Sequence, residues 1–303
     1  MVNKERDDEV LKNNSKKWWS NHSQDYVNPG EIPHLGVPDE MNDNDFIDYI
    51  NKIDNNFRED AYFAQDGSNL LFSKLIPYGD LSGKKVLEIG CGLGAHTEIL
   101  SRSGAELTSI DLSETSVKTT RRRIKLKKLS AEIILADAEN LPFQSNYFDY
   151  IWTWGVIHHS PNTKKCSEEL ERVLKINGKV GIMLYNKNSL YNWLNVIFRY
   201  GILQGKLFNH SIQDLHNMYT DGKEDKGSPL AKYYTSKEIE KNLLPNIKFY
   251  KSHAYEKKHA FSFFIPKKYR RSWEGLIPNS LYTFIWSRYG FLLFKEGKKF
   301  SRF

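Results

Sequence analysis

The stretch VLEIGCGLGAHTE, residues 86–98, constrains the fold more than any other part of the chain. An apolar run with strand character leads into three alternate glycines and then into residues with helix character. Glycine at such a junction lets the backbone turn tightly and approach a ligand closely. The junction therefore predicts a Rossmann-like, doubly wound α/β sheet that binds its ligand at the carboxyl ends of its strands.

The middle of the chain continues this alternation of strands and helices. The residue pattern predicts strands at 84–89, 105–111, 131–137, 148–154 and 179–185, and helices at 94–104, 113–129 and 162–175. Strands separated by helices pair in parallel through right-handed crossovers. The basic residues of the second helix are predicted to form its solvated outer face: Arg121, Arg122, Arg123, Lys125, Lys127 and Lys128.

Composition limits the class of protein. A chain of 303 residues, 40% of them hydrophobic, can bury a sizeable core. The two cysteines, Cys91 and Cys166, argue against a disulfide framework or a cysteine metal site. Residues 1–19 lack the apolar stretch of a signal peptide, and no run approaches the roughly 20 apolar residues of a membrane-spanning helix. We therefore expect a cytoplasmic protein without a metal.

The glycine loop itself indicates the kind of ligand. Gly90, Gly92 and Gly94 are spaced G-x-G-x-G, whereas a dinucleotide site has G-x-G-x-x-G. Glu88 lies close by, and its carboxylate would repel a pyrophosphate. It suits a ligand with a cationic end, and S-adenosylmethionine carries an ammonium, a sulfonium and an adenosine. The loop predicts S-adenosylmethionine as the cofactor.

Further residues stand where this cofactor would need them. Asp111 ends the second strand, where a carboxylate accepts hydrogen bonds from ribose hydroxyls, and Asp137 ends the third, near the adenine edge. A strand-end Asp can equally cap the next helix, but the order and spacing of these residues favour binding. The predicted cofactor-binding residues are Glu88, Gly90, Cys91, Gly92, Gly94, Asp111, Leu112, Asp137, Ala138 and Trp154.

Residues 84–185 resemble the class I S-adenosylmethionine-dependent methyltransferases, in particular the UbiE-like, type 11 branch. The resemblance is carried by VLEIGCGLG, SIDLSE, ADAENLPF, GVIHHSPN and RVLKINGKV. It implies a seven-stranded sheet with an antiparallel last strand, for which residues 289–299 are the candidate and residues 247–255 the strand before it.

The resemblance also implies a division of the chain. Residues 1–83 would be an N-terminal helical lid region, and residues 84–303 the methyltransferase domain. Insertions at about 186–235 and 253–284 are predicted to form a substrate cap, since long insertions at a ligand edge are usually functional. The aromatic residues Trp18, Trp19 and Tyr26 either close over the site or anchor the lid by packing.

Charge is unevenly distributed. Residues 246–303 hold thirteen Lys or Arg against three Glu, together with sixteen aromatic residues. This mixture could meet nucleic acid, a membrane surface or an anionic small molecule, and we expect either an anionic small-molecule substrate or peripheral contact with an anionic membrane. The alternative is a solvated basic face over an aromatic core.

Two adjacent histidines follow the fourth strand, where the resemblance places the reactive methyl group. Neutral imidazole is well matched to removing a proton near pH 7. His159 is predicted to be the catalytic base, because it matches the position at which related methyltransferases often carry a pocket histidine. His158 is assigned a structural role, and the alternative is that both histidines only hydrogen-bond the loop backbone.

The predicted function is methyl transfer from S-adenosylmethionine to a small-molecule acceptor that is anionic, sugar-linked or lipid-linked. A nucleic-acid acceptor is disfavoured, because the fourth strand ends in WTWGVIHH rather than in an Asp/Asn-Pro-Pro-aromatic segment, and no cysteine stands there as a nucleophile. A nucleic-acid or protein methyltransferase and a non-catalytic S-adenosylmethionine-binding protein remain as alternatives. Oxygen, nitrogen and carbon acceptors all stay open.

Overall fold

The computed structural model describes residues 2–22, 41–61, 64, 70–221, 227–256, 284 and 286–301. Its centre is an eight-stranded sheet. The strands are β1 (Lys85–Ile89), β2 (Glu106–Asp111), β3 (Glu132–Leu135), β4 (Phe148–Trp154), β5 (Leu174–Asn186), β6 (Tyr233–Tyr234), β7 (Ile247–Tyr255) and β8 (Leu292–Lys299).

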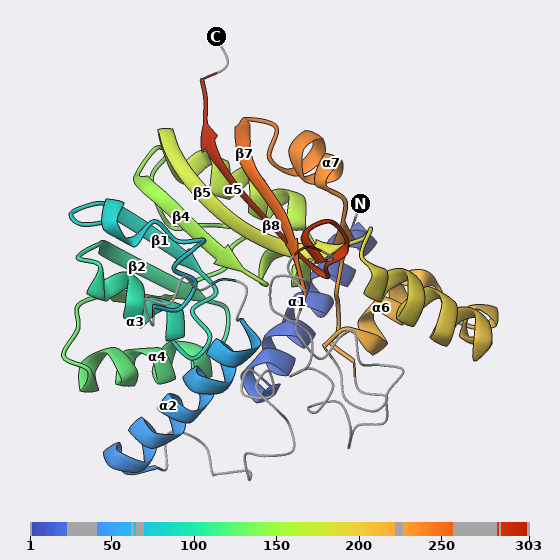
Figure 1. The fold of residues 1–303 in the computed structure, drawn as a ribbon, viewed down its shortest axis with the longest axis horizontal. Coiled ribbons are helices and arrows are strands. Elements are labelled where there is room, and N and C mark those ends of the chain that lie inside the picture. The colour runs from blue at the N-terminus through green and yellow to red at the C-terminus, as the bar shows by residue number, and fades with distance from the viewer. Residues whose placement is uncertain are drawn as a thin grey trace.

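The order of the strands across the sheet is β3-β2-β1-β4-β5-β8-β7 (Figure 1). Strands β1 to β5 pair in parallel, and β8 lies antiparallel between β5 and β7. This topology confirms the predicted doubly wound sheet with an antiparallel last strand. The short β6 adds an eighth strand by pairing with the end of β5.

Helices cover both faces of the sheet. The α-helices are α1 (Val2–His22), α2 (Asp43–Asp60), α3 (Ala95–Arg102), α4 (Glu114–Leu126), α5 (Thr163–Val173), α6 (Ile212–Tyr219) and α7 (Ser236–Glu238). The other helical segments are η2 (Tyr78–Asp80), η3 (Ile157–His159), η4 (Tyr191–Leu203), η5 (Lys206–Phe208) and η6 (Ile239–Leu243). Of these, η4 and η6 have π-helical hydrogen bonding and the others are 3-10 turns.

Side chains along the strands alternate between two buried layers, as period 2 requires. Trp152 of β4 packs in one layer with Leu100 of α3 and Phe72. Its neighbour Ile151 points to the opposite layer and packs with Leu170 of α5. Burial on both faces explains why these strands read as continuous apolar runs.

The predicted boundaries of β4, β7 and β8 agree with the structure, whereas those of β5 do not. Strands β4 and β7 span the predicted residues, and β8 lies within residues 289–299. Strand β5 begins earlier than predicted, at Leu174, and its register against β4 shifts between Phe148 and Tyr150. Near this irregularity Asn177 has a φ of 67°.

One prediction for α4 is wrong, because Arg123 does not lie on a solvated face. Its side chain is buried, and its guanidinium contacts the carboxylates of Asp54 and Glu98 and the Leu93 carbonyl. Helical periodicity turns position 123 inward beside the buried Ile124. The two carboxylates compensate the charge of the buried arginine.

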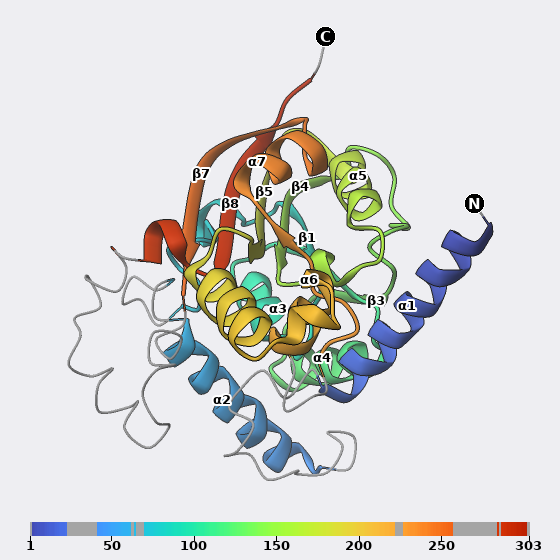
Figure 2. The same cartoon turned by 90° about the vertical axis from the view of Figure 1, so that its right-hand side faces the viewer.

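The N-terminal helix α1 lies along the edge of the sheet where the parallel strands end (Figures 1 and 2). It is fixed there at two points, by an ion pair from Lys12 to Asp137 and a hydrogen bond between Ser20 and Ser113. The location suits the predicted lid, which stays a prediction. Tyr26 lies outside the described residues.

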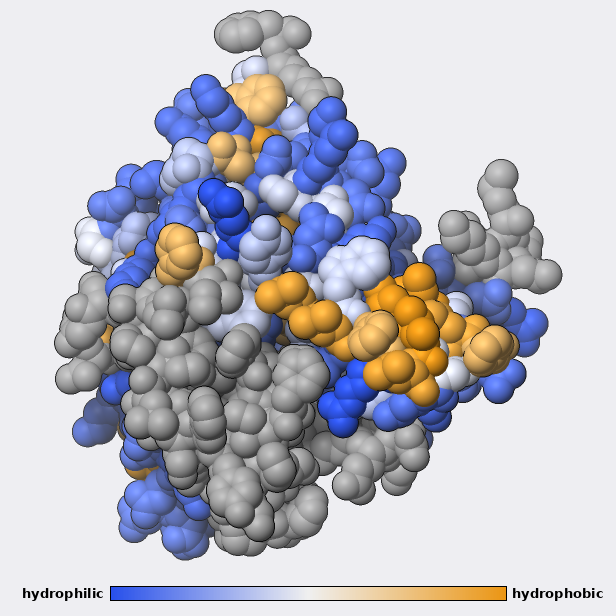
Figure 3. All heavy atoms as spheres, turned by 45° about the vertical axis from the view of Figure 1, so that its right-hand side comes forward, coloured by the Kyte–Doolittle hydropathy of each residue, from blue (hydrophilic) through white to orange (hydrophobic). Residues whose placement is uncertain are grey.

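The two predicted cap insertions are described to different extents. The first, residues 186–235, forms η4, η5, α6 and β6, and Figure 3 shows apolar residues gathered on its surface. The second, residues 253–284, lies almost entirely outside the described residues, and so does Trp273 of the basic C-terminal region.

Candidate active site

The glycine loop between β1 and α3 has the conformation that its sequence predicts. Gly90, Gly92 and Gly94 all have positive φ, at 87°, 52° and 79°. A Cβ on Gly90 would lie 2.2 Å from Cγ2 of Val156, whereas no described heavy atom lies within 4 Å of the Cβ position of Gly92. Larger residues would be strained here, and the backbone at Gly92 is left open to a ligand.

Asp111 ties the end of β2 to this loop. Its carboxylate accepts hydrogen bonds from the backbone N–H of Gly92 at 3.0 Å and of Ser113 at 2.9 Å. Burial raises the pKa of this carboxyl, and the backbone N–H groups oppose that rise. Each carboxylate oxygen keeps a second acceptor position, which suits a ribose hydroxyl.

Glu88 lies behind the loop and is almost fully buried. Its Oε2 accepts hydrogen bonds from the hydroxyls of Thr97 in α3 and Ser109 in β2, both at 2.6 Å. Burial raises the pKa of Glu88 to about 7. A nearby cation would favour the ionised form, so the carboxyl suits the cationic end of the predicted cofactor. Sequence reasoning did not foresee its second role, which is to join β1 to α3 and β2.

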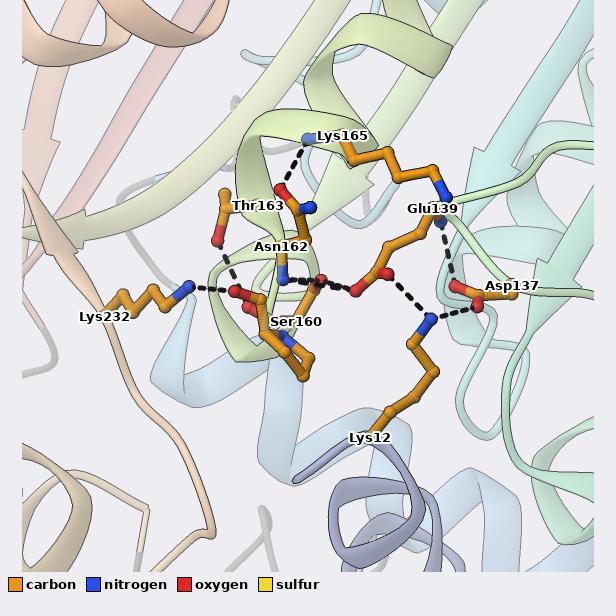
Figure 4. A network of polar contacts seen from close by, with 9 residues as sticks. Lys12, Asp137, Glu139, Ser160, Asn162, Thr163, Lys165 and Lys232 are labelled. Atoms are coloured by element: carbon orange, nitrogen blue, oxygen red, sulfur yellow. Dashed lines mark hydrogen bonds and ion pairs between the residues drawn. The ribbon is translucent and has the colours of Figure 1, made fainter. Parts of the chain in front are cut away.

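Asp137 belongs to a polar network that sequence reasoning largely missed (Figure 4). Lys12 of α1 lies 2.7 Å from Asp137 and 2.7 Å from Glu139. Glu139 in turn accepts hydrogen bonds from Ser160 and from the backbone N–H of Asn162. Burial alone would lower the pKa of Lys12, but the hydrogen bonds and charges of the two carboxylates raise it. The network joins α1 to the loops after β3 and β4.

The remaining predicted cofactor residues surround this edge in less polar settings. Cys91 is buried, and burial raises the pKa of its thiol well above the usual value, so it stays uncharged. Leu112 and Ala138 are half-buried next to Asp111 and Asp137. Trp154 stacks on Trp152, with ring centroids 5.7 Å apart, in an aromatic cluster on one face of the sheet.

His159 lies in η3, just after β4, and is 5% exposed. Its Nδ1 is 2.6 Å from the carbonyl oxygen of Leu230. Because a carbonyl can only accept, Nδ1 carries the hydrogen and Nε2 of the neutral ring has a lone pair. Burial lowers the pKa of His159, although the Asp221 carboxylate opposes this shift. The imidazole is therefore neutral near pH 7.

The surroundings of Nε2 come from distant parts of the chain. Oδ2 of Asp221 lies 3.8 Å from Nε2, and the hydroxyl of Tyr185 donates to Oδ1 of the same carboxylate at 2.6 Å. The Trp19 ring of α1 lies 4.8 Å from the imidazole. Among the described residues, Nε2 has no hydrogen-bond partner. Local sequence offers no signal for Asp221, which follows α6 in the first insertion.

His158 has a different environment from its neighbour. It is fully buried, and its ring packs against Tyr185 with centroids 3.9 Å apart. Neither ring nitrogen has a hydrogen-bond partner among the described residues, and burial holds its pKa well below the usual value. His158 is a packed, neutral ring under the site.

Two negative observations apply to the described part of the chain. No group of three or more His, Cys, Asp or Glu residues is arranged there to hold a metal ion. No described helix has both the length and the apolar character to cross a membrane.

Solved structures share this fold. A putative methyltransferase from Bacillus halodurans superposes with a TM-score of 0.51 at 17% identity, over 78% of this chain and 100% of that chain. The cyclase SpnF superposes with a TM-score of 0.50 at 14% identity, over 78% and 85% of the two chains. These likenesses show that the chain has the fold of these structures, and the glycine loop and the strand-end carboxylates lie where such a fold binds its ligand.

Sequence comparison identifies a methyltransferase domain in part of the chain. Residues 87–182 match the type 11 family, described as a methyltransferase domain, and the chain contains that domain. The phthiotriol/phenolphthiotriol dimycocerosates methyltransferase of Mycobacterium tuberculosis is 34% identical over 110 residues, which is 36% of this chain and 40% of the relative. Methyltransferase GfsG of Streptomyces halstedii is 33% identical over 33% of this chain and 37% of its own. The matches thus cover less than half of these relatives.

Proposed function

We propose that the protein transfers a methyl group from S-adenosylmethionine to a hydroxyl group of a lipid or other small-molecule acceptor, giving S-adenosylhomocysteine. The observation that carries the proposal is the buried, neutral His159, whose Nε2 lone pair has no described hydrogen-bond partner. Support for the acceptor class comes from the relative named for phthiotriol and phenolphthiotriol dimycocerosates. Two buried, unpaired cysteines support a cytoplasmic location as part of this proposal.

The residues that would hold the cofactor fit its chemical groups. The open backbone at Gly92 lets a ligand approach, Asp111 offers acceptor positions for ribose hydroxyls, and Glu88 offers negative charge. When bound, S-adenosylmethionine supplies a methyl group on a positively charged sulfur that leaves as a neutral thioether. The protein positions the two reactants, which is a large part of such catalysis.

His159 supplies the proton acceptor. Its Nε2 takes the proton of the acceptor hydroxyl while that oxygen forms its bond to the methyl carbon. The resulting imidazolium keeps its Nδ1–H bond to the Leu230 carbonyl and is stabilised by the Asp221 carboxylate, 3.8 Å from Nε2. The proton then passes to water. Trp19 and Tyr185 limit the access of water during the transfer.

The test compares two histidine variants with each other. His159→Gln removes the base, and we expect turnover to fall by roughly 100-fold while S-adenosylhomocysteine affinity stays within a few-fold. His253→Gln changes an exposed histidine on β7 and serves as the matched control with unchanged turnover. Equal small losses in both variants would contradict a base and favour an acceptor that needs no deprotonation.

The acceptor is found by a separate experiment. The protein is incubated with methyl-labelled S-adenosylmethionine and cell extract, and the extract is divided into lipid, small-molecule, protein and nucleic-acid fractions. We expect label in the lipid or small-molecule fraction. Label in nucleic acid or protein would contradict the proposed acceptor class. Cofactor binding with no label in any fraction would indicate a non-catalytic protein.

A further inference from the structure

The first insertion presents an apolar surface to solvent. It comprises Trp193, Leu194, Phe198, Ile202 and Leu203 of η4 and Phe208 of η5, here called the outer face. Phe208 is 90% exposed and Leu203 is 67% exposed. Figure 3 shows an orange area over the helices that project to the right in Figure 1. Contiguous exposed apolar surface of this kind commonly marks an interaction site.

Helical spacing gathers these residues on one side of η4. Positions 193, 198 and 202 are separated by four or five residues, and positions 194 and 203 adjoin them. The π-helical hydrogen bonding of η4 gives a turn of between four and five residues, so these positions share one face.

The opposite side of the same helices is already packed. Tyr200 stacks on Tyr219 of α6 with centroids 3.7 Å apart, and Nε2 of His216 contacts the side-chain oxygen of Asn192 at 2.9 Å. Val196 is fully buried. These contacts fix η4 to α6, so the apolar residues of the outer face lie on the side of η4 that faces away from α6.

The segment of chain that forms the outer face carries charges of one sign. Between residues 187 and 213 the chain has three basic residues, Lys187, Arg199 and Lys206, and no Asp or Glu. Lys187 lies 3.5 Å from Glu238, whereas Arg199 is exposed beside the apolar residues. The next acidic residue, Asp214, is engaged with Ser211 in the capping box of α6.

We propose that the outer face docks on an anionic lipid bilayer. A helix in the interfacial region buries Trp, Phe and Leu at the headgroup boundary while Arg and Lys contact anionic headgroups, and the outer face has this composition. A second copy fits less well, since a two-fold contact would bring Arg199 and Lys206 of both copies together.

The position of the outer face relative to the candidate active site agrees with this partner. Helix α6 packs beneath η4, and the chain continues from α6 to Asp221, which faces His159. The Tyr191 hydroxyl also donates to the Tyr219 carbonyl at 2.6 Å, which joins the two helices near this point. The docked protein would hold the candidate site next to the bilayer, where a lipid-linked acceptor would be found.

Vesicle flotation tests the proposal with the full chain. We expect the protein to float with vesicles of phosphatidylglycerol and phosphatidylcholine at low salt, and to bind at least about tenfold more weakly at 0.5 M salt or to pure phosphatidylcholine. Leu203→Ser with Phe208→Ser should weaken binding at least about tenfold, because apolar area can no longer be buried. Arg199→Glu with Lys206→Glu should do the same through charge.

A matched control changes exposed apolar residues elsewhere. Ile176→Ser with Tyr250→Ser should bind vesicles like the unmodified protein. Equal binding by the outer-face variant and the control would overturn the proposal, and so would no flotation at low salt. A dimer in sedimentation that Leu203→Ser with Phe208→Ser converts to monomer, without vesicle binding, would assign the face to a second copy. Because vesicle binding needs no turnover, its failure is distinguishable from failure of methyl transfer.

Discussion

Single side chains at the candidate site hold the glycine loop in place and also belong to the proposed cofactor site. Asp111 holds the glycine loop through the N–H groups of Gly92 and Ser113 and still has acceptor positions for a ribose. Glu88 likewise joins α3 and β2 through Thr97 and Ser109 while it places a carboxyl beside the loop. The spacing in the sequence predicted the ligand role of both residues, but the structural role depends on partners up to 21 positions away.

Replacing Asp111 tests the cofactor assignment. Asp111→Asn keeps a carbonyl oxygen for one backbone N–H but removes the charge, so we expect S-adenosylhomocysteine to bind about tenfold more weakly in calorimetry. Asp149→Asn is a suitable control, since Asp149 accepts from Lys85 and Lys175 at the opposite edge of the sheet. Unchanged affinity in Asp111→Asn, or preference of the protein for NAD, would contradict the assignment.

Among the elements, α1 is attached to the rest of the protein largely through polar contacts. Lys12 lies between Asp137 and Glu139, Ser20 meets Ser113, and Trp19 lies beside His159. One helix thus reaches the loops after β2, β3 and β4. A helix held by a few polar contacts is weakly attached, so it can detach locally without global unfolding of the protein.

Lys12→Met should loosen this attachment. The change leaves Asp137 and Glu139 close together without their shared cation, so we expect dissociation of S-adenosylhomocysteine to be about three- to tenfold faster. Amide hydrogen exchange of α1 should rise in parallel. Lys17→Met, at an exposed position of the same helix, should change neither quantity. Identical dissociation rates for the two variants would show that α1 does not retain the ligand.

In the last strand, basic residues that the sequence groups in the C-terminal region make contacts inside the fold. Lys295 of β8 is buried and lies 2.6 Å from Glu240, and Lys299 donates to the carbonyls of Glu171 and Leu174. These basic residues of the C-terminal region stabilise the sheet and are not displayed to a partner. The docking surface that we propose lies instead on the first insertion. The net charge per residue is smaller there, but the basic side chain of Arg199 is exposed to solvent.

For the whole molecule, buried histidines make stability depend on pH. Burial lowers the pKa of His96 to about 3 and of His216 to about 4, and it also lowers the pKa values of His158 and His159. The unfolded chain therefore binds more protons than the folded chain below the ordinary histidine pKa of about 6.5. Glu88 acts in the opposite direction, because burial raises its pKa to about 7.

The free energy of unfolding should accordingly fall between pH 7.5 and pH 5.5. Each deeply buried histidine contributes a loss of about 1.4 kcal/mol over this window, and Glu88 offsets part of the sum. Chemical denaturation at the two pH values measures the change. His96→Gln keeps an acceptor for the Trp152 indole. This change should reduce the loss of unfolding free energy by about 1.4 kcal/mol, the contribution of one buried histidine. An unchanged pH dependence in His96→Gln would contradict a neutral His96 in the folded state.

Local patterns in the chain were sufficient to predict the doubly wound sheet, the glycine loop and the strand-end carboxylates, whereas the antiparallel last strand was implied by the resemblance to a known family. Period 2 in the strands, helical periodicity and glycine spacing are properties of neighbouring residues, so they can be read without the fold. The partners of His159 could not be predicted in this way, because Leu230 is 71 positions away and Asp221 belongs to an insertion. The inward position of Arg123 and the exposure of the outer face could not be predicted either. Both depend on which side of a helix packs against the rest of the protein, and long-range packing determines that side.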